Sequence, residues 1–346
     1  MRAKSFLVVF TCIVATTILI LTFGDQHPKI QSLVSETHRQ LKNNFRNIKD
    51  KFDGKADVKK LEADERYLSL LGFGEKARLY PDDIWHNSSL PVIVTYVLQG
   101  DTEQGVGLAR NIAHFLPNHT LLVYYFGLPD QDYQALATYC NSSRCVLVKF
   151  DLSVFPSHVS DDRIHAFRPL IIQDALSRAG AVLYLDSDQR VVTSRLEPLL
   201  AKTRASSLVT WRTKQPVTAL THPRMFKYFA AKRDSFYFLP MVEVARLLVF
   251  NTGSVHAHIM LPWVQCALTH DCILPIGAQS GGCRFDKKPY YRYSGCHSYD
   301  ASALNIVLGL HFKFDADQYA LWEEEVYFKK AADLLSADNT TDLSPL

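Results

Sequence analysis

The chain has 346 residues, of which 47% are hydrophobic, and its formal net charge is +3. This length is sufficient for one large catalytic domain with appendages, and the composition permits a sizeable core. The charge is too close to neutral to indicate nucleic-acid binding, and no basic stripe interleaved with aromatic residues occurs in the sequence. Nucleic acid is therefore excluded as the expected partner.

An uncharged segment lies close to the start of the sequence. Residues 5–23 carry no charged side chain and are about long enough to cross the hydrocarbon core of a bilayer. Arg2 and Lys4 precede this segment, and basic residues favour the cytoplasmic side. We therefore predict a cytoplasmic tail (1–4), a transmembrane anchor (5–23) and a luminal remainder. A cleaved signal peptide is the alternative, although no small-residue cleavage site is obvious near Gly24.

The cysteines and glycosylation sequons agree with a luminal location. Cys12 lies in the uncharged segment, which leaves six cysteines and fifteen ways of pairing them. Short loops favour three local pairs, and an oxidising lumen favours disulfides over zinc because no CxxC or Cys-His zinc spacing occurs. The expected pairs are Cys140–Cys145, Cys266–Cys272 and Cys283–Cys296. The four Asn-X-Ser/Thr sequons are at Asn87, Asn118, Asn141 and Asn339.

A polar stretch, residues 24–88, separates the anchor from the globular part and is predicted to be a stem. Its apolar residues recur in steps of three and four, which indicates one narrow stripe of a helix. Such a stripe could pair two copies of the chain as a short coiled coil, and a solvated spacer is the equal alternative. The stripe consists of Ile30, Leu33, Thr37, Leu41, Phe45, Ile48 and Phe52.

Strands and helices alternate from residue 89 onward. This alternation predicts an α/β domain over residues 89–332, with right-handed crossovers and a mostly parallel sheet. The predicted strands are Pro91–Leu98, Thr120–Phe126, Cys145–Phe150 and Ala181–Leu185. The predicted helices are Gln104–Phe115, Gln131–Tyr139 and Phe167–Ala179.

The regular alternation of predicted strands and helices ends after residue 188. Short strands are predicted at Leu208–Trp211 and Ala245–Asn251, with an irregular segment rich in proline, aromatic and basic residues over 212–240. Two further helices are predicted at His256–Ala267 and Ser302–Leu310. Residues 333–346 are polar and are predicted to form a loose tail.

Two carboxylates follow the apolar strand Ala181–Leu185 directly, at Asp186 and Asp188. In open α/β sheets, ligands bind beyond the carboxyl ends of the strands. Two neighbouring carboxylates repel each other unless a positive charge lies between them, and a divalent cation carrying phosphate oxygens supplies that charge. The pattern favours transfer from a sugar diphosphate. The alternative is that Asp186 caps a turn and Asp188 is a solvated loop residue.

Four segments together resemble a known family. Arg168–Gln173 followed by Val182–Asp188 is similar to the nucleotide-sugar half of GT-A fold glycosyltransferases, whose DxD signature ends a parallel strand. Leu248–Gly253 and His297–Asn305 resemble the acceptor-side strand and a D-Q-S-x-L-N segment of that group. The resemblance covers about residues 90–312. With the anchor and stem, it points to a type II Golgi glycosyltransferase of a poorly characterised invertebrate-type family.

This resemblance implies a Rossmann-like sheet flanked by helices and a set of ligand roles. Asp188 is expected to ligate Mn²⁺ (or Mg²⁺) directly, and Asp186 to bind the ribose or the metal through water. His297 or His311 is the candidate third ligand, with a surface or core position as the alternative for either ring. The expected donor is a nucleotide sugar, most simply a UDP-sugar, and the expected acceptor a glycan or glycoprotein.

Three further residues are candidates for donor binding. A guanidinium matches phosphate oxygens bidentately, so Arg168 is expected near the diphosphate, with a structural pair to a carboxylate such as Asp174 as the alternative. Gln99 ends the first strand and is expected to approach the base and ribose, or else to belong to a simple turn. Asn251 is expected to hydrogen-bond donor or acceptor sugar.

An inverting transfer requires a carboxylate base, for which Asp300 and Glu243 are the candidates. Asp300 matches the family segment although Ala301 replaces its usual glutamine, and either carboxylate could instead cap a helix. A retaining enzyme would not need the base. Two rival functions remain: a paired-carboxylate hydrolase, for which the pair is poorly spaced, and an inactive luminal protein that retains the fold.

Overall fold

The computed structural model describes residues 61–74, 90–322 and 327–334. The chain divides into two units, residues 1–57 and 58–346. The predicted cytoplasmic tail, the anchor and the helical stripe of the stem all lie outside the described residues. Within the described ranges, no helix combines the length and apolar character that a membrane crossing requires.

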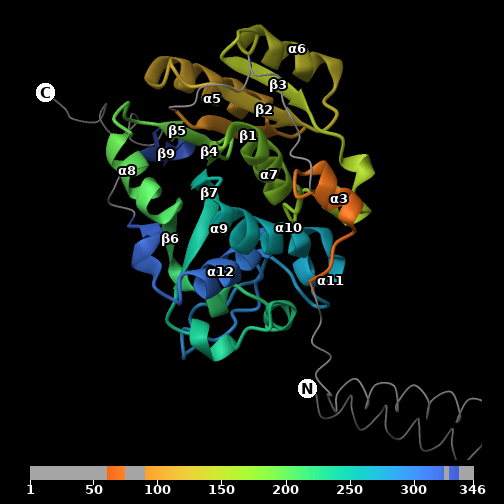
Figure 1. Ribbon diagram of the computed structural model, residues 1–346, viewed down its shortest axis with the longest axis vertical. Coiled ribbons are helices and arrows are strands. Elements are labelled where there is room, and N and C mark those ends of the chain that lie inside the picture. Colours follow the sequence, from red (N-terminus) through yellow and green to blue (C-terminus); the bar gives the residue numbers. More distant parts are fainter. Residues whose placement is uncertain (1–60, 75–89, 323–326, 335–346) are drawn as a thin grey trace, which may run out of the picture. The chain divides into compact units, whose positions relative to one another are not determined.

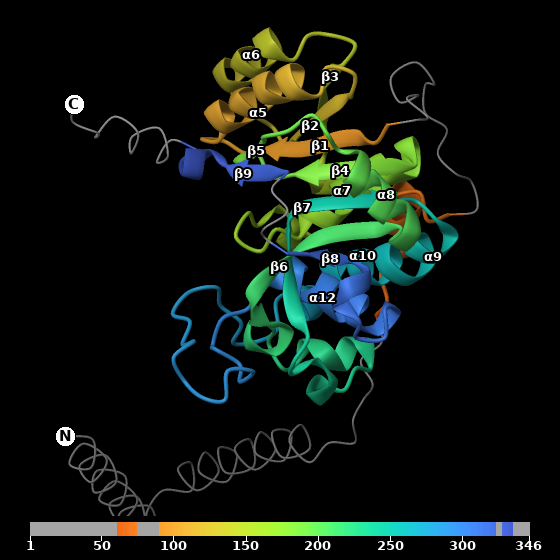
Figure 2. The same cartoon turned by 90° about the vertical axis from the view of Figure 1, so that its left-hand side faces the viewer.

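A seven-stranded sheet forms the centre of the larger unit, in the order β3-β2-β1-β4-β7-β6-β8. Strand β7 is antiparallel to both of its neighbours, and the other pairs in the sheet are parallel. The mostly parallel sheet confirms the α/β class (Figures 1 and 2). The strands are β1 (Val92–Val97), β2 (Leu121–Tyr125), β3 (Cys145–Lys149), β4 (Ala181–Leu185), β6 (Leu208–Pro216), β7 (Pro240–Phe250) and β8 (Ala320–Leu321).

The central strands are apolar on both faces because helices cover both sides of the sheet. All six residues of β1 are buried, as are four of the five residues of β4. Their β-branched and aromatic side chains suit a strand buried on both faces. One face packs on α5 (Thr102–Phe115), α6 (Asp130–Tyr139) and α8 (Glu197–Ser206). The other packs on α7 (Phe167–Ala179), α10 (Leu261–Leu268) and α12 (Tyr299–His311).

Shorter elements complete the unit. A two-stranded antiparallel sheet pairs β5 (Gln189–Val191) with β9 (Phe328–Lys330). The short helices are α3 (Glu65–Leu70), α9 (Gly253–Val255) and α11 (His270–Ile273). All three expected disulfides, Cys140–Cys145, Cys266–Cys272 and Cys283–Cys296, are present.

Helix α7 is joined to β4 by a single residue, Gly180. Its φ is +76°, in the left-handed region where glycine carries no Cβ penalty, and its N–H bonds to the carbonyl of Leu176 at 2.9 Å. This helix end turns the chain at once into β4. The local sequence therefore fixes where β4 ends, and with it the position of Asp186.

The ribbon of β6 and β7 is longer than the sequence predicts. The expected strands end at Trp211 and begin at Ala245, whereas the observed ones reach Pro216 and begin at Pro240. Their register shifts twice, and the polar residues of this stretch hide the strand period. Since β7 is antiparallel to β4, its first residues lie at the edge of the sheet where β4 ends.

Residues 61–74, which the sequence assigns to the stem, pack on the globular unit. Leu71 is 1% exposed, and the amide of Gln173 donates to its carbonyl at 3.1 Å. The ring of Phe73 lies 4.7 Å from that of His256. Two apolar side chains in a polar stretch therefore attach this segment to the core.

Candidate functional site

The acidic pair lies where β4 gives way to a tight turn. The N–H of Asp186 still bonds to Ala245 of β7 at 2.9 Å, and the N–H of Gln189 bonds back to the Asp186 carbonyl at 2.9 Å. Asp188 occupies this turn, and its carbonyl accepts from Ala331 at 2.8 Å. Both carboxylates are thus held by main-chain bonds at the carboxyl edge of the sheet.

Arg168 connects the first of these carboxylates to the predicted base. Its guanidinium lies 3.6 Å from Asp186 and 3.1 Å from Asp300, measured between the nearest nitrogen and carboxylate oxygen. Arg168 is in the first turn of α7, and Asp300 is the second residue of α12 rather than its N-cap. Residues 132 positions apart in the sequence therefore meet in a buried ion pair. Asp174, the alternative partner, instead contacts Arg178 at 2.6 Å.

Burial and charge act in opposite directions on this group of residues. Burial raises the pKa of Asp300 to about 7, although the charge of Arg168 opposes the rise. Burial alone would lower the pKa of Arg168, but the charges of Asp186 and Asp300 outweigh it and hold that pKa well above its usual value. Asp300 is therefore a carboxyl group that gains and loses a proton near neutrality, which is suitable for a general base.

Two tyrosines complete the surroundings of Asp186. The hydroxyl of Tyr184 donates to one of its oxygens at 2.5 Å, and the other oxygen faces Arg168. Burial, followed by the charge of Asp186, raises the pKa of Tyr96 to about 12. Tyr96 and Tyr184 therefore remain neutral at physiological pH, and both oxygens of Asp186 have a polar neighbour.

The residues next to the ion pair adopt a costly backbone. His165, three positions before Arg168, has a φ of +51°, and Tyr299, directly before Asp300, has a φ of +42°. Non-glycine residues in the left-handed region cost of order 1–3 kcal/mol each, and they concentrate at functional sites. The surrounding packing therefore holds both ends of the ion pair in place.

A cavity of 790 Å³ opens at the carboxyl ends of β1, β2 and β3. Its apolar walls include Phe126, Phe150 and Phe167, and its polar groups include Gln99 and Asp162. A volume of this size is typical of small-molecule and cofactor sites. Gln99 thus lies where the sequence places it. The remaining lining residues are Val97, Leu98, Gly127, Leu128, Lys149, Asp151, Leu152, Ser153 and Ser160.

Asp188 is not among the residues that line this cavity, but it lies close enough to Asp101, two positions after Gln99, for its charge to act there. Burial raises the pKa of Asp101, and the charges of Asp162 and Asp188 raise it further. Since Asp162 lines the cavity, the three carboxylates share one negatively charged region. One oxygen of Asp188 accepts a hydrogen bond from the amide of Gln189 at 2.9 Å. A cation close to these carboxylates would relieve their mutual repulsion.

The described residues contain no group of three or more His, Cys, Asp or Glu side chains able to hold a metal ion. A metal that binds together with a diphosphate needs only one or two protein carboxylates, because phosphate oxygens and water complete its shell. Carboxylate oxygens are the ligands that Mg²⁺ and Mn²⁺ prefer. Asp188 and Asp186 fit that requirement, and no third protein ligand is required.

The two histidines proposed as third ligand have other partners. One ring nitrogen of His297 lies 3.2 Å from the carbonyl of Ile273, and the other accepts the N–H of His222 at 3.2 Å. His311 ends α12, roughly 16 Å along the helix from Asp300. Its ring stacks on His258. The prediction of His311 beside the acidic pair is therefore wrong, and His297 would have to give up two hydrogen bonds to bind a metal.

His297 provides a test of this arrangement through the pH dependence of stability. Burial lowers its pKa from 6.5 to about 3, so the folded state holds it neutral while the unfolded chain protonates it. Its contribution is therefore complete above about pH 6.5 and is lost as the pH falls toward 3. Between pH 7.5 and 5.0, we expect the native protein to lose about 2 kcal/mol more unfolding free energy in urea than His297→Gln. Equal losses would contradict this buried, neutral state.

The two remaining candidates lie at opposite edges of the sheet. Glu243 is on β7, where burial raises its pKa against the opposing charge of its ion-pair partner Arg246. It lies on the Asp186 side of the sheet, since its next-but-one neighbour Ala245 bonds to Asp186. Asn251 follows the far end of β7 and bonds to Gly180, roughly 20 Å from Asp186. Its predicted role in sugar binding is wrong because β7 is antiparallel.

Several site residues were missed by sequence reasoning. Lys149, Asp151 and Asp162 line the cavity at or after the end of the third strand, to which no motif drew attention. The rule that ligands bind beyond parallel strand ends could have identified them. Trp211 and Trp263 are fully buried and therefore not available to stack on a sugar, and the indole of Trp263 donates to the Asp300 carbonyl at 2.9 Å.

Comparisons with known proteins yield structural neighbours only. No family model and no curated protein matches the chain. Mouse xyloside xylosyltransferase 1 is similar with a TM-score of 0.39 and 12% identity, over 67% of this chain and 84% of that one. The mannosyltransferase Ktr4p from S. cerevisiae gives a TM-score of 0.43 and 10% identity, over 80% and 86%. Both neighbours are glycosyltransferases, but scores this low carry no argument about the activity of this chain.

Proposed function

We propose that this protein is a metal-dependent glycosyltransferase of the GT-A type. It transfers a sugar from a nucleotide sugar, most simply a UDP-sugar, to a glycan or glycoprotein. The observation that carries the proposal is the 790 Å³ cavity at the carboxyl ends of β1–β3, together with the Asp186–Asp188 turn at the same edge of the sheet, where β4 ends. This is the edge at which open α/β sheets bind nucleotides.

Each part of the site has a role in this reaction. The apolar cavity with Gln99 at the end of β1 accommodates the base and ribose. Mn²⁺ or Mg²⁺, held by Asp188 and Asp186, would neutralise the leaving diphosphate when bound. Arg168 holds Asp186 and Asp300 in fixed positions through two contacts. In an inverting reaction Asp300, whose pKa is about 7, takes the proton of the acceptor hydroxyl.

The proposal extends to the cellular setting. The uncharged segment 5–23 makes the protein a single-pass type II protein of the Golgi membrane, with its catalytic domain in the lumen. The three disulfides are consistent with that oxidising compartment. The helical stripe within residues 24–88 would pair two copies of the chain.

One observation favours a second candidate, an inactive luminal protein that retains the fold. Both oxygens of Asp186 are already engaged, by Tyr184 and Arg168, and Ala301 stands where the resembling family has glutamine. In this alternative the acidic pair is a structural part of the sheet edge. Nucleotide binding separates the two candidates.

The test is calorimetric titration of the luminal chain with UDP, with and without Mn²⁺. We expect binding that requires the metal and that weakens at least about tenfold, or about 1.4 kcal/mol, in Asp188→Asn. Asp271→Asn is the matched control, because it removes an exposed carboxylate on α11 that does not line the cavity. Absence of UDP binding at millimolar concentration would overturn the proposed function. Unchanged affinity in Asp188→Asn would overturn the metal-site assignment.

A further inference from the structure

A second cavity, of 910 Å³, lies between the end of the β6–β7 ribbon and the loop closed by Cys283–Cys296. The ribbon and the residues beside it form one wall, and the loop forms the other. We refer to this cavity as the ribbon groove. It is lined by Lys214, Gln215, Pro216, Tyr237, Phe238, Pro240, Lys288, Pro289, Tyr290 and Tyr291.

The ribbon groove and the candidate site share one edge of the sheet. The last residues of β6 and the first of β7 lie at the edge where β4 ends in Asp186. Figure 2 shows the loop in blue on the same side of the molecule as β5 and β9, which adjoin the acidic turn. The loop also runs from Cys296 directly into the first turn of α12, which carries Asp300.

Aromatic rings form much of the groove. Tyr237 and Tyr291 stack with their centroids 4.3 Å apart, and Phe238 meets Tyr291 edge-on at 5.7 Å. Phe238 is 86% exposed and Tyr290 is 61% exposed. Clustered, exposed aromatic residues mark binding surfaces, and their rigid rings bury much area at low entropic cost. The C–H faces of sugar rings are suitable partners for such apolar ring faces.

The charge of the groove is positive. Lys214 and Lys288 line it, and none of its described lining residues carries a carboxylate. The loop 283–296 holds four basic residues and one acidic residue. The basic residues are Arg284, Lys287, Lys288 and Arg292, and the acidic one is Asp286. The net charge of this loop is therefore +3, which equals the formal net charge of the whole chain. Such a local concentration of positive charge favours an anionic occupant.

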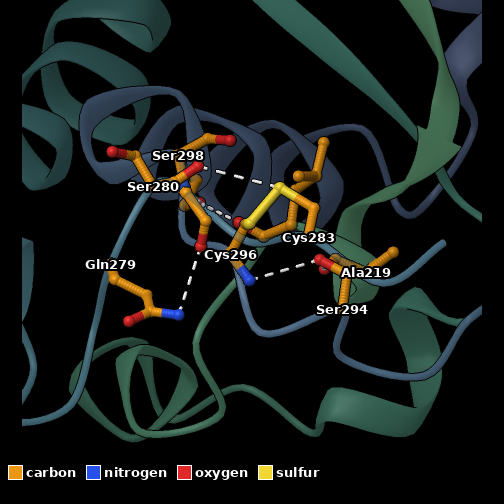
Figure 3. The surroundings of a disulfide bond; sticks show 10 residues. Ala219, Gln279, Ser280, Cys283, Ser294, Cys296 and Ser298 are labelled. Carbon is orange, nitrogen blue, oxygen red and sulfur yellow. Dashed lines mark hydrogen bonds between the residues drawn. A yellow bond between two sulfur atoms is a disulfide. The ribbon is translucent and has the colours of Figure 1, made fainter.

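The loop is fixed to the short turn Val217–Ala219, which directly follows β6, rather than loosely attached. Beside the Cys283–Cys296 disulfide, Ser294 donates to the carbonyl of Ala219 through its N–H at 2.9 Å and through its hydroxyl at 2.7 Å (Figure 3). The hydroxyl of Thr218 donates to the Tyr291 carbonyl at 2.7 Å. Both walls are therefore preorganised, which lowers the entropic cost of binding.

We propose that the ribbon groove binds an anionic oligosaccharide, carrying carboxylate or sulfate groups, as the acceptor of the reaction. The aromatic faces contact the sugar rings, and Lys214 and Lys288 pair with the acidic groups. The statement that this oligosaccharide is the acceptor rests on the proposed function, because the groove is connected to Asp300 only through the shared edge of the sheet. Binding of the oligosaccharide itself requires only the groove.

The probes are a heparin-derived hexasaccharide, which is sulfated and contains uronate, and the neutral chitohexaose. Titration at 0.15 M NaCl should show at least tenfold tighter binding of the anionic hexasaccharide. Phe238→Ala and Lys288→Ala should each weaken that binding about fivefold to tenfold. Their matched controls are Phe285→Ala and Lys287→Ala, which alter the same loop at positions outside the lining; Phe285→Ala should leave affinity unchanged, and Lys287→Ala should weaken it clearly less than Lys288→Ala.

Three results would overturn the inference. They are equal affinity for the two hexasaccharides, equal loss in the control variants, and equally tight binding of hexathymidylate, which would reveal a general polyanion surface. The UDP titration separates this inference from the proposed function. Hexasaccharide binding without UDP binding would leave a glycan-binding groove on a protein that is not a transferase. UDP binding without hexasaccharide binding would refute the groove alone.

Discussion

Replacement of Arg168 by methionine should lower the free energy of unfolding by about 3 kcal/mol at pH 8, because it leaves Asp300 without its buried partner. The loss should be smaller at pH 6. Asp300 has a pKa of about 7, so below that pH it is largely protonated and needs the guanidinium less. Arg168 therefore contributes most above pH 7, and its contribution decreases as the pH falls through that value. Urea unfolding at both pH values measures the difference.

The double variant Arg168→Met/Asp300→Asn is the control for this effect. Neutralising Asp300 removes the charge that would otherwise be stranded, so the double variant should recover much of the stability lost in Arg168→Met at pH 8. Asp186 is 21% exposed on its side chain and can turn to solvent, so it should contribute less. A loss that is the same at pH 6 and pH 8 would show that Arg168 acts through packing rather than charge.

The first half of the fold could be predicted from the sequence because its strands and helices are each specified by neighbouring residues. Apolar runs alternate with helical stripes from β1 to β4, and Gly180 marks the turn between α7 and β4. The direction of β7 could not be predicted, because a strand pattern does not reveal whether its neighbour runs parallel. Because the direction of β7 was not known, Asn251 was expected at the carboxyl edge of the parallel strands, whereas it lies at the opposite edge. The extension of β7 to Pro240 was missed because its polar residues break the apolar run.

In the candidate site, too, the contacts between residues far apart in the sequence could not be predicted. Asp186, Asp188 and Gln99 lie at the carboxyl edge because each comes within three residues of the end of a recognisable strand, and their ligand roles stay predictions. The ion pair of Arg168 with Asp300 could not be predicted, because two helix starts 132 residues apart meet only through the tertiary fold. His311 was misplaced for a related reason, since it lies at the opposite end of α12 from Asp300.

Asp300 is buried and Glu243 is partly buried, and both carboxylates act electrostatically on or with Asp186, so the kinetics of their variants should distinguish them. If Asp300 takes the acceptor proton, Asp300→Asn should lower kcat by about 10²–10⁴-fold, whereas Glu243→Gln should keep most of the activity. The kcat of the native enzyme should rise with pH and level off above about 7, where Asp300 is ionised. The residual activity of Asp300→Asn should lack that rise.

These results depend on separating chemistry from binding and folding. UDP affinity should change much less in Asp300→Asn than in Asp188→Asn, because Asp300 is connected to Asp186 only through Arg168. Its thermal stability should also be measured, since the amide keeps the size of the carboxyl group but weakens the contact with Arg168. A stable Asp300→Asn enzyme with native kcat and the native pH profile would make Asp300 a positioning residue only. The base would then be sought at Glu243, or the reaction would be a retaining one that needs none.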